Sequence, residues 1–418
     1  MKKMSALILA AGKGTRMRSR TPKVLHNILG KPMIGHLLES IRASGVDDII
    51  VVAGYGSELL RDFLKDKDVS VVIQKELLGS GDAVSSARKL LEKNFENVMV
   101  VCGDTPLISV KTFAAMADKH KKSAALTTIL TAIVDDPTGY GRMVRGDDGK
   151  ISKIVEDSEA QFYEEAIKEI NVGTYCFNVK KLFETLALVR SENKKKEYFL
   201  TDVIEIMHKN RGVVESVTAE DTGEIIGINT RRDLAEATKT LKDNILYDLM
   251  DSGVTIQDPA STTIYPGVSI GCDTIIYPNT FIESGVEIGK GCRIGPFARL
   301  RKGVCLADGV QIGNFVELVR TTVDEETKVK HHTYLGDTIV GKHVNIGAGT
   351  ITANYDGKNK SRTIIEDNAF IGVGAILIAP VKIGKSAIVG AGSVVTKGHD
   401  VKQGAIVAGV PARPFKKK

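Results

Sequence analysis

The sequence predicts two domains of different architecture: an α/β domain with a mostly parallel sheet, followed by a parallel β-helix. Two patterns lead to this prediction. In the first half, short apolar runs alternate with segments of helical periodicity, and in the second half aliphatic residues recur every six positions. A chain of 418 residues is also too long for one ordinary domain core. We expect a first domain at residues 1–229, a linker helix at 230–252 and a second domain at 253–418.

The first half contains apolar, β-branched-rich runs that predict buried strands. They lie at residues 6–10, 49–53, 69–73, 98–102 and 126–132. Segments between them, such as 33–43 and 83–91, have helical spacing. Buried strands that alternate with helices are typical of a parallel sheet covered on both faces. In such sheets ligands bind beyond the carboxyl ends of the strands.

The linker helix is predicted from apolar residues spaced three or four apart, which share one helical face. These are Leu234, Ala237, Leu241, Ile245 and Leu249. Asn229 and Thr230 can cap the start of this helix, and Gly253 can end it.

The second half repeats with a period of six. Ten aliphatic residues follow this spacing: Ile264, Ile270, Ile276, Ile282, Ile288, Ile294, Leu300, Leu306, Ile312 and Leu318. The frame then breaks and returns at Ile365, Ile371, Leu377, Ile383, Val389 and Val395. Neither an α-helix nor an alternating strand has this period, and sixteen matches exclude chance. A triangular coil with one hexapeptide per face explains it, and glycine at the tight corners explains the 41 glycines.

Composition narrows the classes of function. The net charge of +6 is modest and the basic residues are interspersed with acids, so we expect no nucleic-acid partner. The five cysteines include no Cys-x-x-Cys pair, which gives no zinc site and fits a reducing compartment. The apolar stretch near the N-terminus is too short for a signal peptide or a membrane span, so we expect a cytoplasmic protein with no membrane partner.

A phosphate-binding site is predicted where the first strand ends. The run Leu9-Ala10-Ala11-Gly12-Lys13-Gly14-Thr15-Arg16 lets backbone N–H groups approach a phosphate, and it adds two cations. Lys23 follows in sequence, and Asp104 stands after another strand, where a carboxylate can hold Mg²⁺ or merely cap a turn. Together these features indicate displacement at a nucleotide α-phosphate.

The motifs of the first half resemble those of N-acetylglucosamine-1-phosphate uridyltransferases. They are Leu-Ala-Ala-Gly-Lys-Gly-Thr-Arg-Met, Pro-Lys-Val-Leu-His at 22–26, Gly-Asp-Thr-Pro-Leu at 103–107, Asp-Pro-Thr-Gly-Tyr-Gly-Arg at 136–142 and Glu-Ile-Asn-Val-Gly at 169–173. The resemblance implies a Rossmann-like nucleotidyltransferase domain. It assigns catalysis to Arg16 and Lys23, and Mg²⁺ to Asp104 and Asn229. It assigns the nucleotide to Leu9, Ala10, Gly12, Gln74, Gly79 and Ser80, and the sugar to Gly141, Glu156, Asn171 and Thr201.

A second site is predicted where the hexapeptide frame breaks. His331 and His332 lie at this break, and an insertion at residues 354–363 interrupts the repeat further on. Insertions into solenoids are often functional. Acetyl transfer to an amine needs a base that works near neutral pH, which suits histidine.

The motifs of the second half, Tyr-Leu-Gly-Asp at 334–337 and the run from Asn345 to Gly357, resemble the glucosamine-1-phosphate N-acetyltransferase half of the same bifunctional family, which is a left-handed β-helix. The resemblance makes His331 the general base, with Glu317 near enough to orient it. It assigns the substrate to Arg301, Tyr334, Asn345, Asn354, Tyr355 and Lys360, and acetyl-CoA to Ala348, Ala391 and Arg413. It implies a homotrimer that uses UTP, N-acetylglucosamine-1-phosphate, glucosamine-1-phosphate and acetyl-CoA, and that supplies cell-wall and lipopolysaccharide synthesis.

The sequence also departs from this family. Phe199 replaces a Tyr near the sugar, Val319 replaces a phosphate-binding Lys, and Gly409 replaces an Arg near the coenzyme. Arg320 is adjacent to Val319, but strand alternation predicts that it points to the opposite face. About two coils are missing before Arg301. These departures leave one alternative open, a uridyltransferase whose β-helix is only a trimerisation scaffold. A third interpretation is a non-enzymatic sugar-nucleotide sensor, and the intact set Arg16, Lys23, Asp104 and Asn229 argues against it.

Overall fold

The computed structural model describes residues 4–194 and 196–415. The chain divides into two compact units, residues 1–238 and 239–418. The division falls inside helix α9 (Arg231–Asp251), which lies where the sequence predicts a linker helix. Thr230 and Asp233 cap its start: Asp233 Oδ2 accepts from the backbone N–H of Asn229 and of Thr230, at 2.8 Å each.

The first unit is built on a nine-stranded sheet with the order β11-β7-β10-β6-β1-β4-β5, to which the hairpin β8–β9 is attached through β10. Strand β1 pairs in parallel with β4 and β6, whereas β10 is antiparallel to its neighbours. The predicted, mostly parallel sheet is confirmed. The strands are β1 (Met4–Ala10), β4 (Ile49–Ala53), β5 (Ser70–Ile73), β6 (Asn97–Cys102), β7 (Thr127–Ile133), β8 (Gly141–Arg145), β9 (Ile151–Val155), β10 (Glu169–Asn178) and β11 (Val214–Thr218), with β2 (Asn27–Ile28) and β3 (Lys31–Pro32) as a separate pair.

Helices cover both faces of this sheet, because alternate side chains of each strand point to opposite faces. Ile8 of β1 joins one core with α1 and α5, whereas Leu7 joins the other with α3, α7 and α8. The helix expected at 83–91 is two helices that meet at Ala87. The helices are α1 (Met33–Ala43), α2 (Ser57–Leu64), α3 (Ser80–Ser86), α4 (Arg88–Asn94), α5 (Val110–Ser123), α6 (Phe162–Glu165), α7 (Val179–Leu186) and α8 (Asp202–Lys209).

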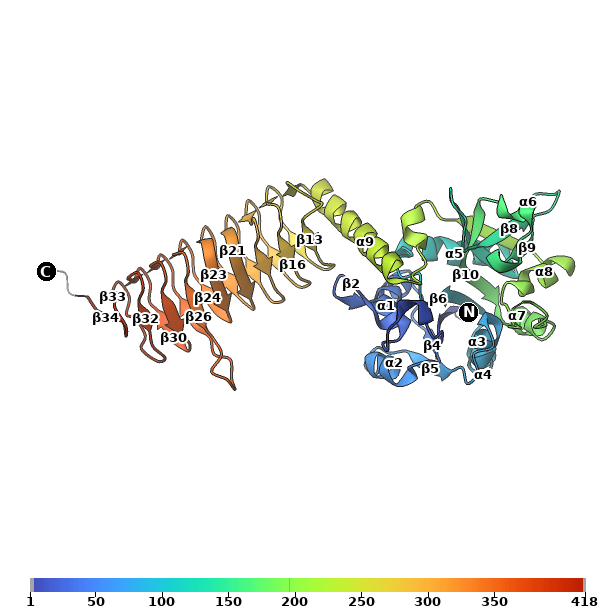
Figure 1. Cartoon of the computed structure of the whole chain (residues 1–418), viewed down its shortest axis with the longest axis horizontal. Coiled ribbons are helices and arrows are strands. Elements are labelled where there is room, and N and C mark those ends of the chain that lie inside the picture. Colours follow the sequence, from blue (N-terminus) through green and yellow to red (C-terminus); the bar gives the residue numbers. More distant parts are fainter. Residues whose placement is uncertain (1–3, 195, 416–418) are drawn as a thin grey trace. The chain divides into compact units, whose positions relative to one another are not determined.

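The second unit is a stack of short parallel strands, coloured yellow to red in Figure 1. Most of them are two or three residues long. They are β12 (Thr255–Ile256), β13 (Thr263–Ile264), β14 (Ser269–Ile270), β15 (Ile275–Ile276), β16 (Phe281–Ile282), β17 (Glu287–Ile288), β18 (Arg293–Ile294), β19 (Arg299–Leu300), β20 (Cys305–Leu306), β21 (Gln311–Val319), β22 (Thr322–Val323), β23 (Lys328–Gly336), β24 (Thr338–Val340), β25 (Asn345–Ile346), β26 (Ile351–Ala353), β27 (Thr363–Ile365), β28 (Phe370–Ile371), β29 (Ile376–Ile378), β30 (Val381–Ile383), β31 (Ile388–Val389), β32 (Val394–Val395), β33 (Ile406–Ala408) and β34 (Arg413–Pro414).

The hexapeptide residues stack in columns inside this unit. Ile264 lies opposite Ile282, and Leu300 opposite Leu318, so that each coil of this part takes eighteen residues. Each of the ten predicted aliphatic residues belongs to or packs against one continuous core. The expected β-helix, with one hexapeptide per face, is thereby confirmed.

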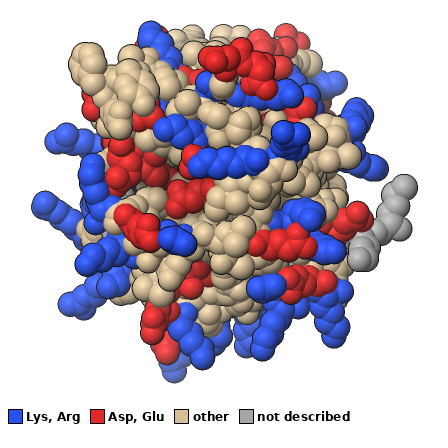
Figure 2. All heavy atoms as spheres, turned by 90° about the vertical axis from the view of Figure 1, so that its right-hand side faces the viewer, with Lys and Arg blue, Asp and Glu red and all other residues tan. Residues whose placement is uncertain are grey.

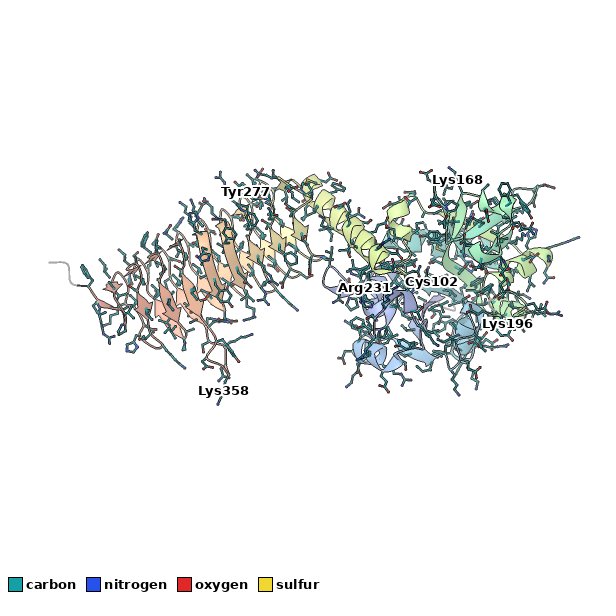
Figure 3. The ribbon with its side chains drawn as sticks, in the orientation of Figure 1. Cys102, Lys168, Lys196, Arg231, Tyr277 and Lys358 are labelled. Carbon is teal, nitrogen blue, oxygen red and sulfur yellow. The ribbon has the colours of Figure 1, made fainter. Side chains whose placement is uncertain are left out.

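The breaks in the repeat are changes in coil length. Leu306 pairs with Val323, seventeen residues on, and Val340 pairs with Ile365, twenty-five residues on. The long coil contains the insertion, in which Tyr355 and Lys360 form an antiparallel bridge. Figure 3 shows this loop leaving the stack, with Lys358 at its tip.

Charge on the surface is mixed. On the face shown in Figure 2, Lys and Arg side chains are interspersed with Asp and Glu. Within the described residues, no helix has both the length and the apolar character needed to cross a membrane.

Candidate active sites

A cavity of about 590 Å³ opens at the carboxyl ends of β1 and β6, as expected for a parallel sheet. Eight of the predicted residues line it: Leu9, Ala10, Gly12, Lys23, Gln74, Gly79, Ser80 and Asp104. Glu197 also lines the cavity and was not predicted, since it follows a lysine-rich run that resembles a solvated loop.

The charged residues of this site form one network. Lys23 Nζ donates to Asp104 Oδ2 at 2.5 Å and to Asn229 Oδ1 at 3.1 Å. Arg16 Nη2 donates to the same Asn229 oxygen at 2.8 Å. Gly14 has a left-handed backbone, and a Cβ there would lie 2.9 Å from the Cβ of Lys23, so the glycine lets the loop pack against this lysine. The four predicted catalytic and metal-binding residues thus lie together.

The oxygens of Asp104 and Asn229 suit a magnesium ion. Both contact one ammonium group, so they lie close to each other, and both are hard oxygen donors. Among the described residues there is no group of three or more His, Cys, Asp or Glu that could hold a metal ion. A metal at this place would therefore need phosphate oxygens or water to complete its shell.

Gln74 is held in a fixed orientation. It is buried, and its Nε2 donates to Asp82 Oδ2 at 2.7 Å and to Gly79 O at 3.2 Å. Its carbonyl oxygen accepts no hydrogen bond in the part of the chain that the structure describes. This oxygen can accept the N–H of a nucleotide base.

The predicted sugar residues lie in two hydrogen-bonded pairs. Thr201 Oγ1 donates to Glu156 Oε1 at 2.8 Å, and Asn171 Nδ2 donates to the hydroxyl of Tyr175 at 2.7 Å. Gly141 is the register partner of Asn171. Cys102, at the end of β6 (labelled in Figure 3), is partly buried, and desolvation raises the pKa of its thiol to about 12, so it stays uncharged. A thiol in this state is no nucleophile.

In the second unit, His331 on β23 lies beside Asn314 on β21, its partner in the strand register. The ring Nδ1 is 3.0 Å from Asn314 Oδ1. With this oxygen as acceptor, Nδ1 carries the proton and Nε2 of the neutral ring is free to accept one. His332 is in the left-handed region at φ 43°, so both histidines are exposed at a corner rather than alternating as in a regular strand.

The structure corrects two expectations about neighbouring residues. The partner of His331 is Asn314 and not Glu317, which instead accepts from Arg301 Nη1 at 3.1 Å. Arg320 does not point away from the site: its left-handed backbone, at φ 47°, ends the strand alternation, and its guanidinium binds Asp337. Asn354 Nδ2 donates to that same carboxylate at 2.5 Å.

The remaining predicted residues lie along the coils. Tyr355 and Lys360 stand on the inserted loop, and Asn345 pairs with Lys328 on β23. The backbone of Ala348 accepts from Gly374, and the backbone of Val373 accepts from Gly392, so Ala348 and Ala391 belong to one column of corners with Val373 between them. Arg413 is exposed and pairs with Ala408 across β33 and β34.

Comparisons with known proteins define the class. Residues 5–243 match the nucleotidyl transferase family. Residues 267–302 match the bacterial transferase hexapeptide, six repeats, and residues 362–397 the hexapeptide repeat of succinyl-transferase. The chain is therefore a two-part transferase, with a nucleotidyl transferase domain and a hexapeptide-repeat domain.

Sequence relatives identify the family. Proteins named bifunctional protein GlmU are 46% identical in Heliobacterium modesticaldum, across 97% of this chain and 95% of the relative, and 45% identical in Carboxydothermus hydrogenoformans, across 94% and 95%. The GlmU of a Geobacillus strain is 45% identical across 97% and 95%. This chain belongs to the GlmU family of bifunctional enzymes.

Proposed function

We propose that this enzyme makes UDP-N-acetylglucosamine in two reactions. The second unit transfers the acetyl group of acetyl-CoA to glucosamine-1-phosphate, and the first unit transfers the uridyl group of UTP to the resulting N-acetylglucosamine-1-phosphate. The network of Arg16, Lys23, Asp104 and Asn229 at the mouth of a nucleotide-sized cavity is the observation that carries the proposal. A sensor would not need these groups. UTP and acetyl-CoA are cytoplasmic metabolites, so the cytoplasm is the proposed location.

In uridyl transfer, a phosphate oxygen of the sugar phosphate attacks the α-phosphorus of UTP, and pyrophosphate leaves with the electron pair of the broken bond. Gln74 reads the uracil ring. Asp104 and Asn229 would hold Mg²⁺, which would neutralise charge on the reacting phosphates. Lys23 and Arg16 move from these oxygens to the phosphates and stabilise the charge that develops there.

The sugar is held by the two hydrogen-bonded pairs around Glu156 and Asn171. Phe199, where the family has a tyrosine, is buried two positions before Thr201 in the sequence, and it lacks the hydroxyl of that tyrosine. We expect looser discrimination between sugars at this position. Comparing kcat/KM for N-acetylglucosamine-1-phosphate and glucose-1-phosphate in wild type and Phe199→Tyr tests this expectation.

In acetyl transfer, Nε2 of His331 takes a proton from the ammonium group of the acceptor. The freed amine attacks the acetyl carbonyl carbon, and the sulfur of coenzyme A leaves with the electron pair of the thioester bond. The leaving sulfur takes up the second proton, which the nitrogen releases as the amide forms. Asn314 keeps the ring oriented through Nδ1. Arg301, Tyr334, Asn345, Asn354, Tyr355 and Lys360 bind the acceptor. The column of Ala348 and Ala391 offers the coenzyme a shallow surface, and Arg413 a cation for its phosphates.

The assembly is proposed to be a homotrimer through the β-helix. Its surface carries a stacked pair of exposed aromatic rings, Phe297 and Phe315, with centroids 5.2 Å apart, and Phe370 is exposed further along. Exposed apolar groups of this kind favour association between copies. Light scattering of the full chain should give three times the chain mass, and a monodisperse monomer would refute the trimer.

The second candidate is a uridyltransferase whose β-helix is only a scaffold. Val319 favours it, because this residue is buried and supplies no cation to a phosphate. One assay separates the two: thiol release from acetyl-CoA with glucosamine-1-phosphate, run beside pyrophosphate release from UTP with N-acetylglucosamine-1-phosphate. Both products are expected. Pyrophosphate without thiol would establish the scaffold.

A further inference from the structure

Arg320 stands at a corner of the β-helix, directly after β21 ends. Its guanidinium forms a fork on Asp337, with Nε 2.5 Å from Oδ1 and Nη2 2.8 Å from Oδ2. The side chain of Arg320 is 42% exposed, whereas that of Asp337 is 18% exposed. Of its five N–H groups two are used, and the other three have no acceptor among the described residues. The guanidinium is therefore fixed in place but still open to an anion.

The same carboxylate connects Arg320 to the candidate acceptor site. Asp337 Oδ2 also accepts from Asn354 Nδ2. At Gly336 an added Cβ would lie 2.6 Å from the hydroxyl of Tyr334 and 2.7 Å from Asn354 Nδ2, so both side chains meet over this glycine. Two residues assigned to the acceptor thus share one small area with the Arg320–Asp337 pair.

The cluster of Arg320, Lys360 and Asp337 carries a net positive charge. The Arg320 hydrogen bonds, with help from Asn354 and Lys360, hold the pKa of Asp337 below its usual range, so this group is ionised. Two cations then face one carboxylate. Arg301 is in the opposite situation, because Glu317 and Glu283 flank it at 3.1 and 3.6 Å. Glu283 also binds Arg299, and these two arginines and two glutamates balance.

We propose that Arg320 binds the phosphate group of the amino-sugar phosphate in the acetyl-transfer site, together with Lys360. The inference rests on the proposed acetyltransferase function of this unit. An arginine fork that a carboxylate holds from one side offers its remaining N–H groups to phosphate oxygens, for which its geometry is suited. Asp337 is then a positioning residue, which orients both Arg320 and Asn354.

Arg320→Gln tests this proposal against a matched control, Lys342→Gln. The control removes another exposed ion pair between neighbouring coils, Lys342 with Glu325 at 3.0 Å. Thiol release from acetyl-CoA is measured with glucosamine-1-phosphate and with glucosamine, which lacks the phosphate. We expect Arg320→Gln to raise KM for glucosamine-1-phosphate by about 10–100-fold, with kcat nearly unchanged. Arg320→Lys should recover part of this loss.

Glucosamine, the acceptor without a phosphate, distinguishes phosphate binding by Arg320 from a purely structural role of this residue. If Arg320 acts only through Asn354, both acceptors will lose activity alike, and the proposal is overturned. It is likewise overturned if KM for glucosamine-1-phosphate does not change. In either case thiol release by the wild type leaves the proposed function intact.

Calorimetry of glucosamine-1-phosphate binding to the full chain distinguishes failure of the function from failure of the inference. Excess UDP-N-acetylglucosamine fills the first unit during this titration. Binding that is lost in Arg320→Gln supports the phosphate site even if the wild type releases no thiol, in which case only acetyl transfer is refuted. A wild type that neither binds nor acetylates the sugar phosphate overturns both.

Discussion

The two candidate sites assemble their residues over different distances in sequence. In the first unit Lys23 meets Asp104 and Asn229, 81 and 206 positions away, because the segments before α1, after β6 and before α9 come together in the fold. In the second unit His331 meets Asn314, and Asp337 meets Arg320, each seventeen positions away. Coil length decides these neighbours. A site on a sheet is therefore protected against small insertions in distant loops, whereas a site on a β-helix changes its partners when one coil gains or loses a residue.

Burial also differs between the two sites. The side chain of Lys23 is 15% exposed and lines a cavity, whereas His331 is exposed on a corner. Charge interactions are stronger where solvent is excluded. Removing a charged group should therefore cost more in the first site than in the second.

The largest effect is expected for Asp104→Ala. Loss of the carboxylate removes a proposed metal ligand and frees Lys23, and uridyl transfer should fall by about 10³-fold or more. Acetyl transfer should not change, because its residues belong to the other unit. Pyrophosphate release across a Mg²⁺ titration measures the first activity, and thiol release the second. Asp118→Ala, at an exposed carboxylate on α5, is the control. Near-normal uridyl transfer by Asp104→Ala would contradict the assignment of Asp104 to the metal.

A smaller loss, about 10²–10³-fold in acetyl transfer, is expected for His331→Ala, which is the lower part of the usual contribution of a general base because this ring is exposed. Asn314→Ala should cost about 10–100-fold, because the ring loses its orientation. His332→Ala should keep most activity. Thiol release between pH 6 and 9 compares the three variants. An inactive His332→Ala beside an active His331→Ala would mean that the base has been assigned one position off.

The smallest effect concerns Asp202, which sequence reasoning missed. Burial, with repulsion from Glu156, raises the pKa of this half-buried carboxyl to about 6. The folded state then binds more protons than the unfolded state between about pH 4 and 6, so the contribution of Asp202 to stability falls as pH rises through 6. Solvent screening limits the effect to about 1 kcal/mol or less.

Thermal unfolding of wild type and Asp202→Asn between pH 4.5 and 7.5 measures this contribution. Relative to the variant, the wild type should become less stable as pH rises. A constant difference in Tm across this range would show that Asp202 titrates normally.

Where a sequence pattern runs without interruption, the positions of its residues in the structure could be predicted. Leu9, Ala10 and Gly12 continue a strand into a glycine loop, and the inward aliphatic residues follow one period through coil after coil. The partners of a residue could not be predicted where the backbone or the coil length departs locally from the regular pattern. Arg320 reaches Asp337 only because its backbone turns left-handed, and Asn314 becomes the partner of His331 only because that coil is seventeen residues long.

The sequence by itself determined the two-part organisation, the strands of the first sheet and the β-helix, and it predicted which residues carry phosphate and proton chemistry. These follow from periodicity and side-chain type, which are local properties. Only the tertiary structure decided which charge faces which. Lys23 lies against the proposed metal ligands, Arg301 is neutralised by two glutamates, and Arg320 stays open beside Asn354. The strength of an electrostatic interaction depends on the distance between the charges and on their exposure to solvent, and the order of residues along the chain specifies neither.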